Sequence, residues 1–112
     1  MTESQDAIAE RLAAAAVLMR EAGALARDYF QRRGELTVEF KGTQDVVSAA
    51  DREVEKLVRA RLAALFPSDG VIGEEEGVQG DTASVWIVDP IDGTQNFLRG
   101  LPYWTVVLAY VR

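Results

Sequence analysis

The sequence predicts an α/β protein in which two long helices pack on a mostly antiparallel sheet. Two long segments repeat apolar residues at steps of three and four, which is the period of a helix. Several short runs of aromatic and β-branched residues are typical of strands. One of these runs ends in two aspartates and a Gly-Thr pair, at the position where α/β sheets place their ligand sites. At 112 residues the chain has the length of one domain with a real core.

The first predicted helix covers about residues 4–33. Gly34 is its natural stop, because glycine accepts the left-handed backbone that ends many helices. The alanine-rich face of this helix indicates close packing in a core rather than a functional surface. This face consists of Ile8, Leu12, Ala15, Met19, Ala22, Ala26 and Phe30.

A second helix is predicted from about Ser48 to Phe66, and Pro67 ends it. Its expected buried face consists of Val54, Leu57, Val58, Leu62, Leu65 and Phe66. Short strands are expected at residues 36–40, 71–72, 85–88 and 103–111, and loops at 41–45 and 77–83. The run 85–88 alternates poorly, which indicates a central strand buried on both faces.

The composition narrows the possible chemistry. A net charge of −6 argues against non-specific binding to nucleic acid or to an anionic membrane. The polar start MTESQDAIAERL is not a secretory signal, and no apolar run is long enough to span a membrane, so a cytoplasmic location is expected. The absence of cysteine and histidine excludes disulfides, thiolate nucleophiles and Cys/His zinc sites. The remaining carboxylates and hydroxyls suit a hard cation such as Mg²⁺.

Three groups of candidate residues each have a structural explanation. Ser48 and Asp51 have the spacing of a capping pair at the start of a helix, so Asp51 alone indicates a cap. The run Glu74 to Glu76 is typical of a solvated acidic loop, since adjacent exposed acids are common. Lys41 alone indicates a solvated surface amine.

The segment from Asp89 to Thr94, DPIDGT, is harder to explain as a turn. Pro90 stiffens it, so Asp89 and Asp92 are held near each other. Two neighbouring carboxylates raise each other's pKa unless a cation shares them, and a bridging divalent metal ion removes the repulsion. Gly93 and Thr94 then present backbone N–H groups at the start of a turn or helix, where a phosphate is stabilised.

Three blocks together resemble the inositol monophosphatase family of Mg²⁺-dependent, lithium-sensitive phosphomonoesterases. They are KGTQDVVSAAD (41–51), IGEE (72–75) and WIVDPIDGTQNF (86–97), in the order of the family. The third block is highly specific, and the order and spacing of the other two add to it. The resemblance implies the layered α+β fold of the sugar phosphatases and a homodimer.

The resemblance also implies the metal ligands. Glu74, Asp89 and the backbone carbonyl of Ile91 are expected to bind a first Mg²⁺. Asp89 and Asp92 are expected to share a second one, which stabilises the leaving oxygen. Glu75 is expected to be a secondary metal contact or a residue of the surrounding shell.

The remaining roles concern the water and the phosphate. By resemblance, Glu74 and Thr94 orient a metal-activated water for in-line attack on phosphorus, and the N–H groups of Gly93 and Thr94 hold the phosphate. Asp51 resembles the acid that the family places near Thr94, and Lys41 its basic residue beside the site. Two metals and a water fit phosphoryl transfer, which needs mainly positioning and charge neutralisation.

Members of that family are more than twice as long as this chain. Residues 1–112 therefore resemble a truncated N-terminal, metal-binding portion of the domain, and the ending WTVVLAYVR stops inside a strand pattern. The part that follows in the family supplies a further aspartate. The expected substrate is a small phosphomonoester such as inositol 1-phosphate. Two alternatives stay open: a histidinol-phosphate phosphatase, suggested by NFLRGLPYW (96–104), and an inactive fragment or interaction module.

Overall fold

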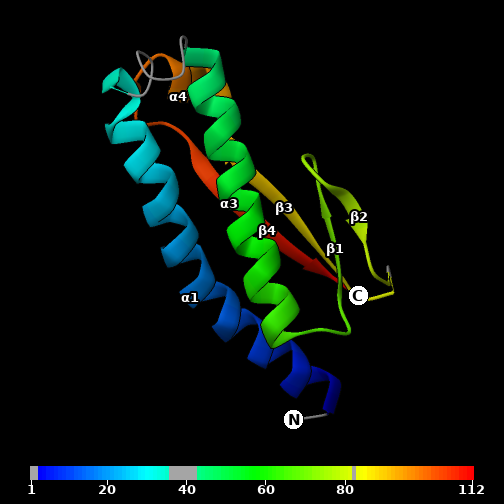
Figure 1. Ribbon diagram of the computed structural model, residues 1–112. Coiled ribbons are helices and arrows are strands. Elements are labelled where there is room, and N and C mark those ends of the chain that lie inside the picture. The colour runs from blue at the N-terminus through cyan, green and yellow to red at the C-terminus, as the bar shows by residue number, and fades with distance from the viewer. Residues whose placement is uncertain (1–2, 36–42, 82) are drawn as a thin grey trace.

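The computed structural model describes residues 3–35, 43–81 and 83–112. Figure 1 shows two long helices beside a small sheet, with a short helix near the start of the second long one. In chain order the elements are α1 (Glu3–Gln31), α3 (Thr43–Leu65), β1 (Gly70–Gly73), β2 (Gly77–Gln79), β3 (Val85–Asp92), α4 (Thr94–Leu98) and β4 (Thr105–Val111).

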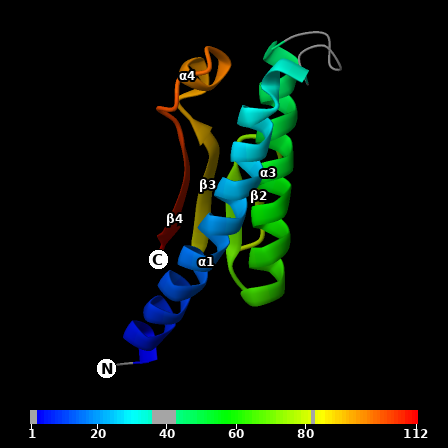
Figure 2. The same cartoon turned by 90° about the vertical axis from the view of Figure 1, so that its left-hand side faces the viewer.

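The described strands form one sheet in the order β2-β1-β3-β4. β1 pairs in parallel with β3, while β2 runs antiparallel to β1 and β4 runs antiparallel to β3. Two of these three pairings are antiparallel, as the sequence predicted. α1 and α3 cover one face of the sheet, with α3 against β3 and α1 against β4 (Figure 2). The predicted fold class, two long helices on a mostly antiparallel sheet, is confirmed.

The main core fills the space between the helices and the sheet. Small residues on α1 let this helix approach α3 and β4 closely, and alternate residues of β3 point toward the helices. The buried members are Leu18, Ala22, Ala26, Val54, Val58, Leu62, Phe66, Val71, Trp86 and Val88. Most of them belong to the two predicted helix faces, so the helical period located the core.

Asp69 connects α1 to the sheet. The guanidinium of Arg11 donates to both carboxylate oxygens of Asp69, at 2.7 and 3.0 Å, and the indole N–H of Trp86 donates to one of them at 3.0 Å. The same guanidinium lies over the rings of Phe66 and Tyr110. Burial opposes ionisation of Asp69, but the hydrogen bonds from Arg11 and Trp86 hold its pKa below the usual value.

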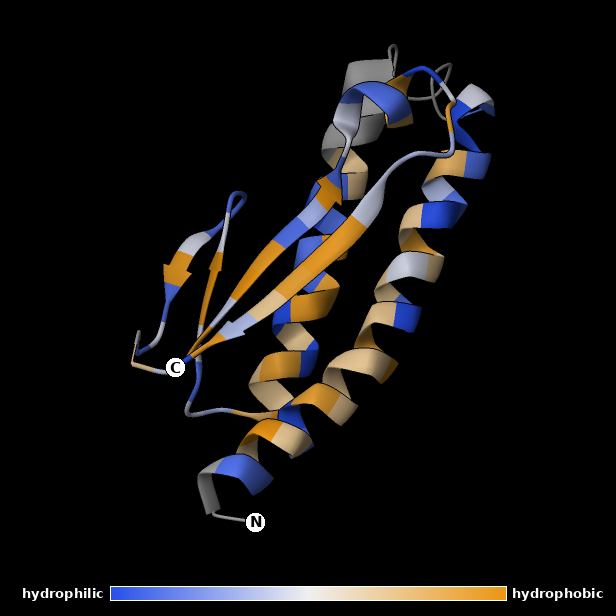
Figure 3. Ribbon diagram, turned by 180° about the vertical axis from the view of Figure 1, so that it is seen from behind, coloured by the Kyte–Doolittle hydropathy of each residue, from blue (hydrophilic) through white to orange (hydrophobic). Residues whose placement is uncertain are grey.

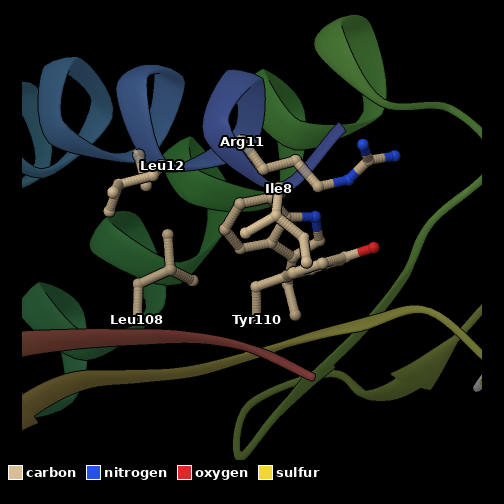
Figure 4. Close-up of a pocket in the computed structure, with 7 residues that line it drawn as sticks. Ile8, Arg11, Leu12, Leu108 and Tyr110 are labelled. Atoms are coloured by element: carbon tan, nitrogen blue, oxygen red, sulfur yellow. The ribbon is translucent and has the colours of Figure 1, made fainter. Parts of the chain in front are cut away.

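Part of the predicted helix faces is exposed instead of buried. Ile8 and Leu12 are 46% and 71% exposed. They line an open hollow together with Leu108 and Tyr110 of β4 (Figure 4). Leu65, in the last turn of α3, is 53% exposed.

The second helix begins earlier than predicted. α3 starts at Thr43, so the expected loop at 41–45 is wrong for residues 43–45, and Ser48 does not cap the helix. Val47, Ala50 and Val54 continue the helical spacing of apolar residues toward the N-terminus, which the prediction of a capping pair overlooked. Asp51 consequently lies inside the helix rather than at its start. The strand expected at 36–40 lies outside the described residues.

Two predictions about strands also need correction. Residues 77–79 of the expected loop 77–83 form β2, which pairs with β1 through Val78 and Ile72. β3 continues four residues beyond 85–88, to Asp92, with an irregular register after Asp89. Ile87 is 42% exposed, so β3 is not buried on both faces. Figure 3 shows the side of the sheet that neither long helix covers, with apolar residues along β3 and β4.

Overpacking of the α1 face tests this core. We expect Ala26→Leu to destabilise the protein by about 1–3 kcal/mol, because Ala26 is fully buried and a larger side chain forces its neighbours apart. Ala24→Leu, at an exposed position on the same helix, should change stability by less than about 0.5 kcal/mol. Urea unfolding of both variants measures the difference, and equal effects would contradict the observed orientation of α1.

Candidate functional site

Three segments bring carboxylates to one end of the sheet. β1 and β3 run parallel, with Gly73 opposite Val88, so their carboxyl ends leave the sheet at the same edge. Glu74 follows β1 there, and Asp89 lies next to Val88 in β3. The first turns of α3 contact α4 and bring Asp51 to the same region. Parallel pairing is therefore what joins two acidic segments that are distant in sequence.

The turn after β3 has a backbone that only glycine fits well. Gly93 has φ 92° and ψ 39°, in the left-handed region, and it precedes α4. A Cβ atom at Gly93 would lie 2.8 Å from the carbonyl oxygen of Tyr103 and 3.2 Å from Cα of Trp104. The hydroxyl of Thr94 donates to the carbonyl of Ile91 at 3.3 Å. These contacts fix where the N–H groups at the start of α4 point.

An aromatic cluster holds α4 in place. Phe97 is fully buried, and its ring centroid lies 5.3 Å from that of Phe30 on α1 and 5.1 Å from that of Trp104. Ala50 of α3 and Ile91 complete the cluster. The site turn is thus supported by α1, by α3 and by the segment before β4.

The carboxylates at this end of the sheet disturb one another. Burial and the negative charges of its neighbours raise the pKa of Asp51 from 3.8 to about 7. In order of effect these neighbours are Glu75, Glu74, Asp89 and Glu55. Burial, and then the charges of Asp92 and Glu74, also raise the pKa of Asp89, whereas a hydrogen bond from the backbone of Ile91 lowers it. The shifts show that these groups lie within electrostatic reach of each other.

The structure therefore gathers most of the acidic residues singled out in the sequence. Asp51, Glu74, Glu75, Asp89 and Asp92 belong to this one region. Within the described segments, however, no three acidic side chains converge closely enough to form a group that could hold a metal ion. Lys41 lies outside the described residues. Ile91 is buried, and its carbonyl accepts the hydrogen bond from Thr94.

Sequence reasoning missed a buried ion pair behind the acidic turn. Glu55 and Arg59 of α3 are both buried and lie one helical turn apart, with Arg59 Nε 3.2 Å from Glu55 Oε2. The carboxylate of Glu55 also accepts the backbone N–H groups of Glu75 and Glu76, at 3.2 and 2.9 Å. The sequence signalled that Glu55 and Arg59 could pair, since they lie four residues apart on one helix, but it did not signal that the pair is buried.

The donor set fits a hard divalent cation. The residues in this region offer carboxylate and carbonyl oxygens, and Mg²⁺ prefers oxygen ligands. Burial, and then the negative charges of neighbouring acids, raise the pKa values of Asp51 and Asp89, and a bound cation would offset that charge. The start of α4, with a glycine before it, places backbone N–H groups beside these acids.

The fold defines an α/β protein whose acidic residues gather at one end of the sheet, and comparison with known proteins identifies the family. A model of the inositol monophosphatase family matches residues 8–112. The chain belongs to the inositol monophosphatase family.

Individual relatives agree with this assignment. The chain is 46% identical over 90 residues to an inositol-1-monophosphatase of Rhizobium meliloti, covering 79% of this chain and 34% of the relative. It is 43% identical over 93 residues to a histidinol-phosphatase of Streptomyces coelicolor, covering 83% and 35%. The solved structure of inositol monophosphatase II from Staphylococcus aureus superposes with a TM-score of 0.75 at 28% identity, covering 91% of this chain and 37% of that one. The chain thus spans about a third of the length of these relatives.

The raised pKa of Asp51 predicts how stability depends on pH without metal. The folded protein holds the Asp51 proton more tightly than the unfolded chain, so this stabilising contribution is present below pH 3.8 and is lost as the pH rises through about 7. We expect Asp51→Asn to be more stable than the parent protein at pH 8, by on the order of 1–2 kcal/mol after allowance for solvent screening.

This advantage should disappear toward pH 4. Denaturant unfolding in the presence of a chelator at both pH values measures it. Asp6→Asn, at an exposed position near the start of α1, is the matched control and should show no such dependence. A stability difference between parent and Asp51→Asn that is the same at pH 4 and pH 8 would refute the prediction.

Proposed function

We propose that the protein carrying this chain hydrolyses a small phosphomonoester in a Mg²⁺-dependent reaction. The observation that carries the proposal is the gathering of mutually repelling carboxylates from α3, the β1–β2 turn and β3 beside the start of α4. An excess of negative charge at one point favours a divalent cation, and the N–H groups at the start of α4 favour a phosphate next to it. The family and the names of the relatives support the same reaction class.

In this proposal residues 1–112 form the N-terminal, metal-binding portion of the phosphatase domain. Glu74, Asp89 and the carbonyl of Ile91 hold one cation, and Asp89 and Asp92 share a second. Glu75 is a further contact or supports the ligands from behind. Bound Mg²⁺ would supply neutralisation of phosphate charge and a lowered pKa for the attacking water.

The other residues position the substrate and the water. Glu74 and Thr94 orient the water in line with phosphorus, and Thr94 can do so because its hydroxyl is held by the carbonyl of Ile91. The backbone N–H groups of Gly93 and Thr94 hold the phosphate oxygens. Asp51 lies near enough to the acids to exchange a proton near neutral pH, and Lys41 is proposed as the basic residue beside the site.

The proposed substrate is inositol 1-phosphate or a related polyol or sugar phosphate. A second candidate is histidinol phosphate, favoured by the segment NFLRGLPYW (96–104) and by 43% identity to a relative named histidinol-phosphatase. Phosphate release from both compounds, compared by kcat/KM in the full-length protein, distinguishes the two.

The proposal also includes inhibition by lithium, a homodimer and a cytoplasmic location. Among the described residues, no helix is long and apolar enough to cross a membrane. The mass of the particle in solution, measured by light scattering, tests the dimer.

Removal of one proposed ligand tests the reaction class. We expect Asp89→Asn in the full-length protein to lower phosphatase activity by about 100-fold or more, because it removes a charge that both cations need. The activity should require Mg²⁺ and be inhibited by lithium. Asp81→Asn, at an exposed position before β3, is the control and should retain activity.

Phosphatase activity that needs no Mg²⁺ and is unchanged by Asp89→Asn would refute the proposal. A full-length protein that releases no phosphate from any small phosphomonoester would instead favour an interaction module, whereas an inactive sample with only the mass of residues 1–112 would favour an inactive fragment. Intact mass measured on the same sample ensures that the full-length chain is being assayed.

A further inference from the structure

We propose that the buried pair Glu55–Arg59 is a positioning device for the acidic turn at residues 74–76, and that it sets the affinity of the site for a divalent cation. The inference rests on the proposed function, because it assigns a cation to that turn. Neither residue belongs to the acidic region itself, since both lie on the inner face of α3.

Glu55 forms its hydrogen bonds with the backbone of the turn rather than with its side chains. Glu55 is 0% exposed, and its two oxygens accept the backbone N–H groups of Glu75 and Glu76 at 3.2 and 2.9 Å. A carboxylate that accepts two successive backbone N–H groups fixes the orientation of both peptide planes. The side chains of residues 74–76 are exposed, so the backbone is what holds the turn.

Arg59 holds the other side of the same turn. It is 6% exposed, pairs with Glu55 at 3.2 Å, and donates to the carbonyl of Gly77 at the start of β2. It also lies 3.4 Å from the side-chain oxygen of Gln79. The pair therefore forms hydrogen bonds with the turn both where β1 ends and where β2 begins.

Gly73 provides an independent sign that the pair and the turn are fitted to each other. A Cβ atom at Gly73 would collide with the carboxylate of Glu55. Glu55 cannot easily move away, because its carboxylate is buried and held by three donors, from Arg59, Glu75 and Glu76. The absence of a side chain at Gly73 lets a helix carboxylate reach directly beneath the acidic turn.

Charge explains why this device needs both residues. A buried carboxylate beneath three glutamates adds to the repulsion in the turn, and Glu55 contributes to the raised pKa of Asp51. Arg59 supplies the opposite charge inside the protein, with its Nε 3.2 Å from Glu55 and at the longer distance of 4.0 Å from the exposed carboxylate of Glu76. The turn is then shaped in advance, and a cation bound to it loses less free energy in ordering its ligands.

Two variants of the full-length protein test the inference. Glu55→Gln replaces the carboxylate with an amide, which keeps one acceptor and turns an N–H group toward the donors. The double variant Glu55→Met, Arg59→Met removes both charges with apolar side chains of similar size, a replacement that buried ion pairs often tolerate without loss of stability. Glu21→Gln is the matched control, since Glu21 pairs with Arg61 between α1 and α3 on the exposed surface, away from the turn.

Three quantities are measured on each protein: the Mg²⁺ dissociation constant by calorimetry, amide hydrogen exchange at Glu75 and Glu76, and stability in urea. We expect both test variants to weaken Mg²⁺ binding by about 10- to 100-fold and to speed exchange at these two amides. Both variants should retain the near-ultraviolet signal of the tryptophans, and Glu21→Gln should change neither binding nor exchange.

Two results would overturn the inference while the proposed function stands. One is faster exchange in the turn with a Mg²⁺ dissociation constant unchanged within about twofold. The other is a double variant that recovers both stability and Mg²⁺ affinity, which would show that Glu55→Gln acts only by unfolding. A parent protein whose Mg²⁺ binding is absent or insensitive to Asp89→Asn overturns the proposed function and this inference together.

Discussion

The parallel pairing of β1 with β3 is the constraint on which the acidic region depends. The two strands share one direction because β2 carries the chain back to the end of the sheet where β1 starts, and the chain then passes to the other side of β1 before β3 begins. With Gly73 opposite Val88, the residues that follow each strand leave at the same edge. A shift of this register by one residue would reverse which side chains of β3 face the core, so burial of Trp86 and Val88 also fixes the position of Asp89.

Like charges at this edge lower the stability of the metal-free fold. Burial, and then the charges of four nearby acids, favour the neutral form of Asp51 and raise its pKa to about 7. The interactions that offset this cost lie elsewhere: Phe97 packs against Phe30 and Trp104, and Asp69 binds Arg11 and Trp86. A cluster that works against folding while its surroundings favour folding is typical of a site shaped by function.

The long elements and the ligand turn could be predicted because their signals are local. The period of α1 and α3 identified the core residues Ala22, Val54 and Leu62, and DPIDGT identified the turn before α4. The start of α3 was wrong because Ser48 and Asp51 have the spacing of a cap, yet the apolar period continues to earlier residues. Exposure of Leu12 could not be foreseen, since it depends on how closely α1 packs on β4.

The pair of Glu55 and Arg59 shows a deeper limit of sequence reasoning. On a helix, a Glu–Arg pair four residues apart is usually an exposed stabilising contact, so its chemistry carries no sign of burial. Its role follows only from the parallel strands and from Gly73, which together bring the turn over the carboxylate. The Glu–Arg pair on α3 and the acidic turn after β1 are each a local pattern. The contact between them is long-range, and neither pattern alone predicts it.

Because residues 1–112 contain no histidine or cysteine, the proposed site depends strongly on backbone groups for hydrogen bonds to a phosphate. Carboxylates can bind a cation and accept protons, but they cannot donate hydrogen bonds to a phosphate when ionised. In the proposed site the donors include backbone N–H groups, and their direction is set by the left-handed backbone of Gly93 and by the packing of Tyr103 and Trp104 against it. In the proposed site the aromatic core beneath α4 positions these N–H groups, so we expect residues that touch no ligand to influence how well a phosphate is held.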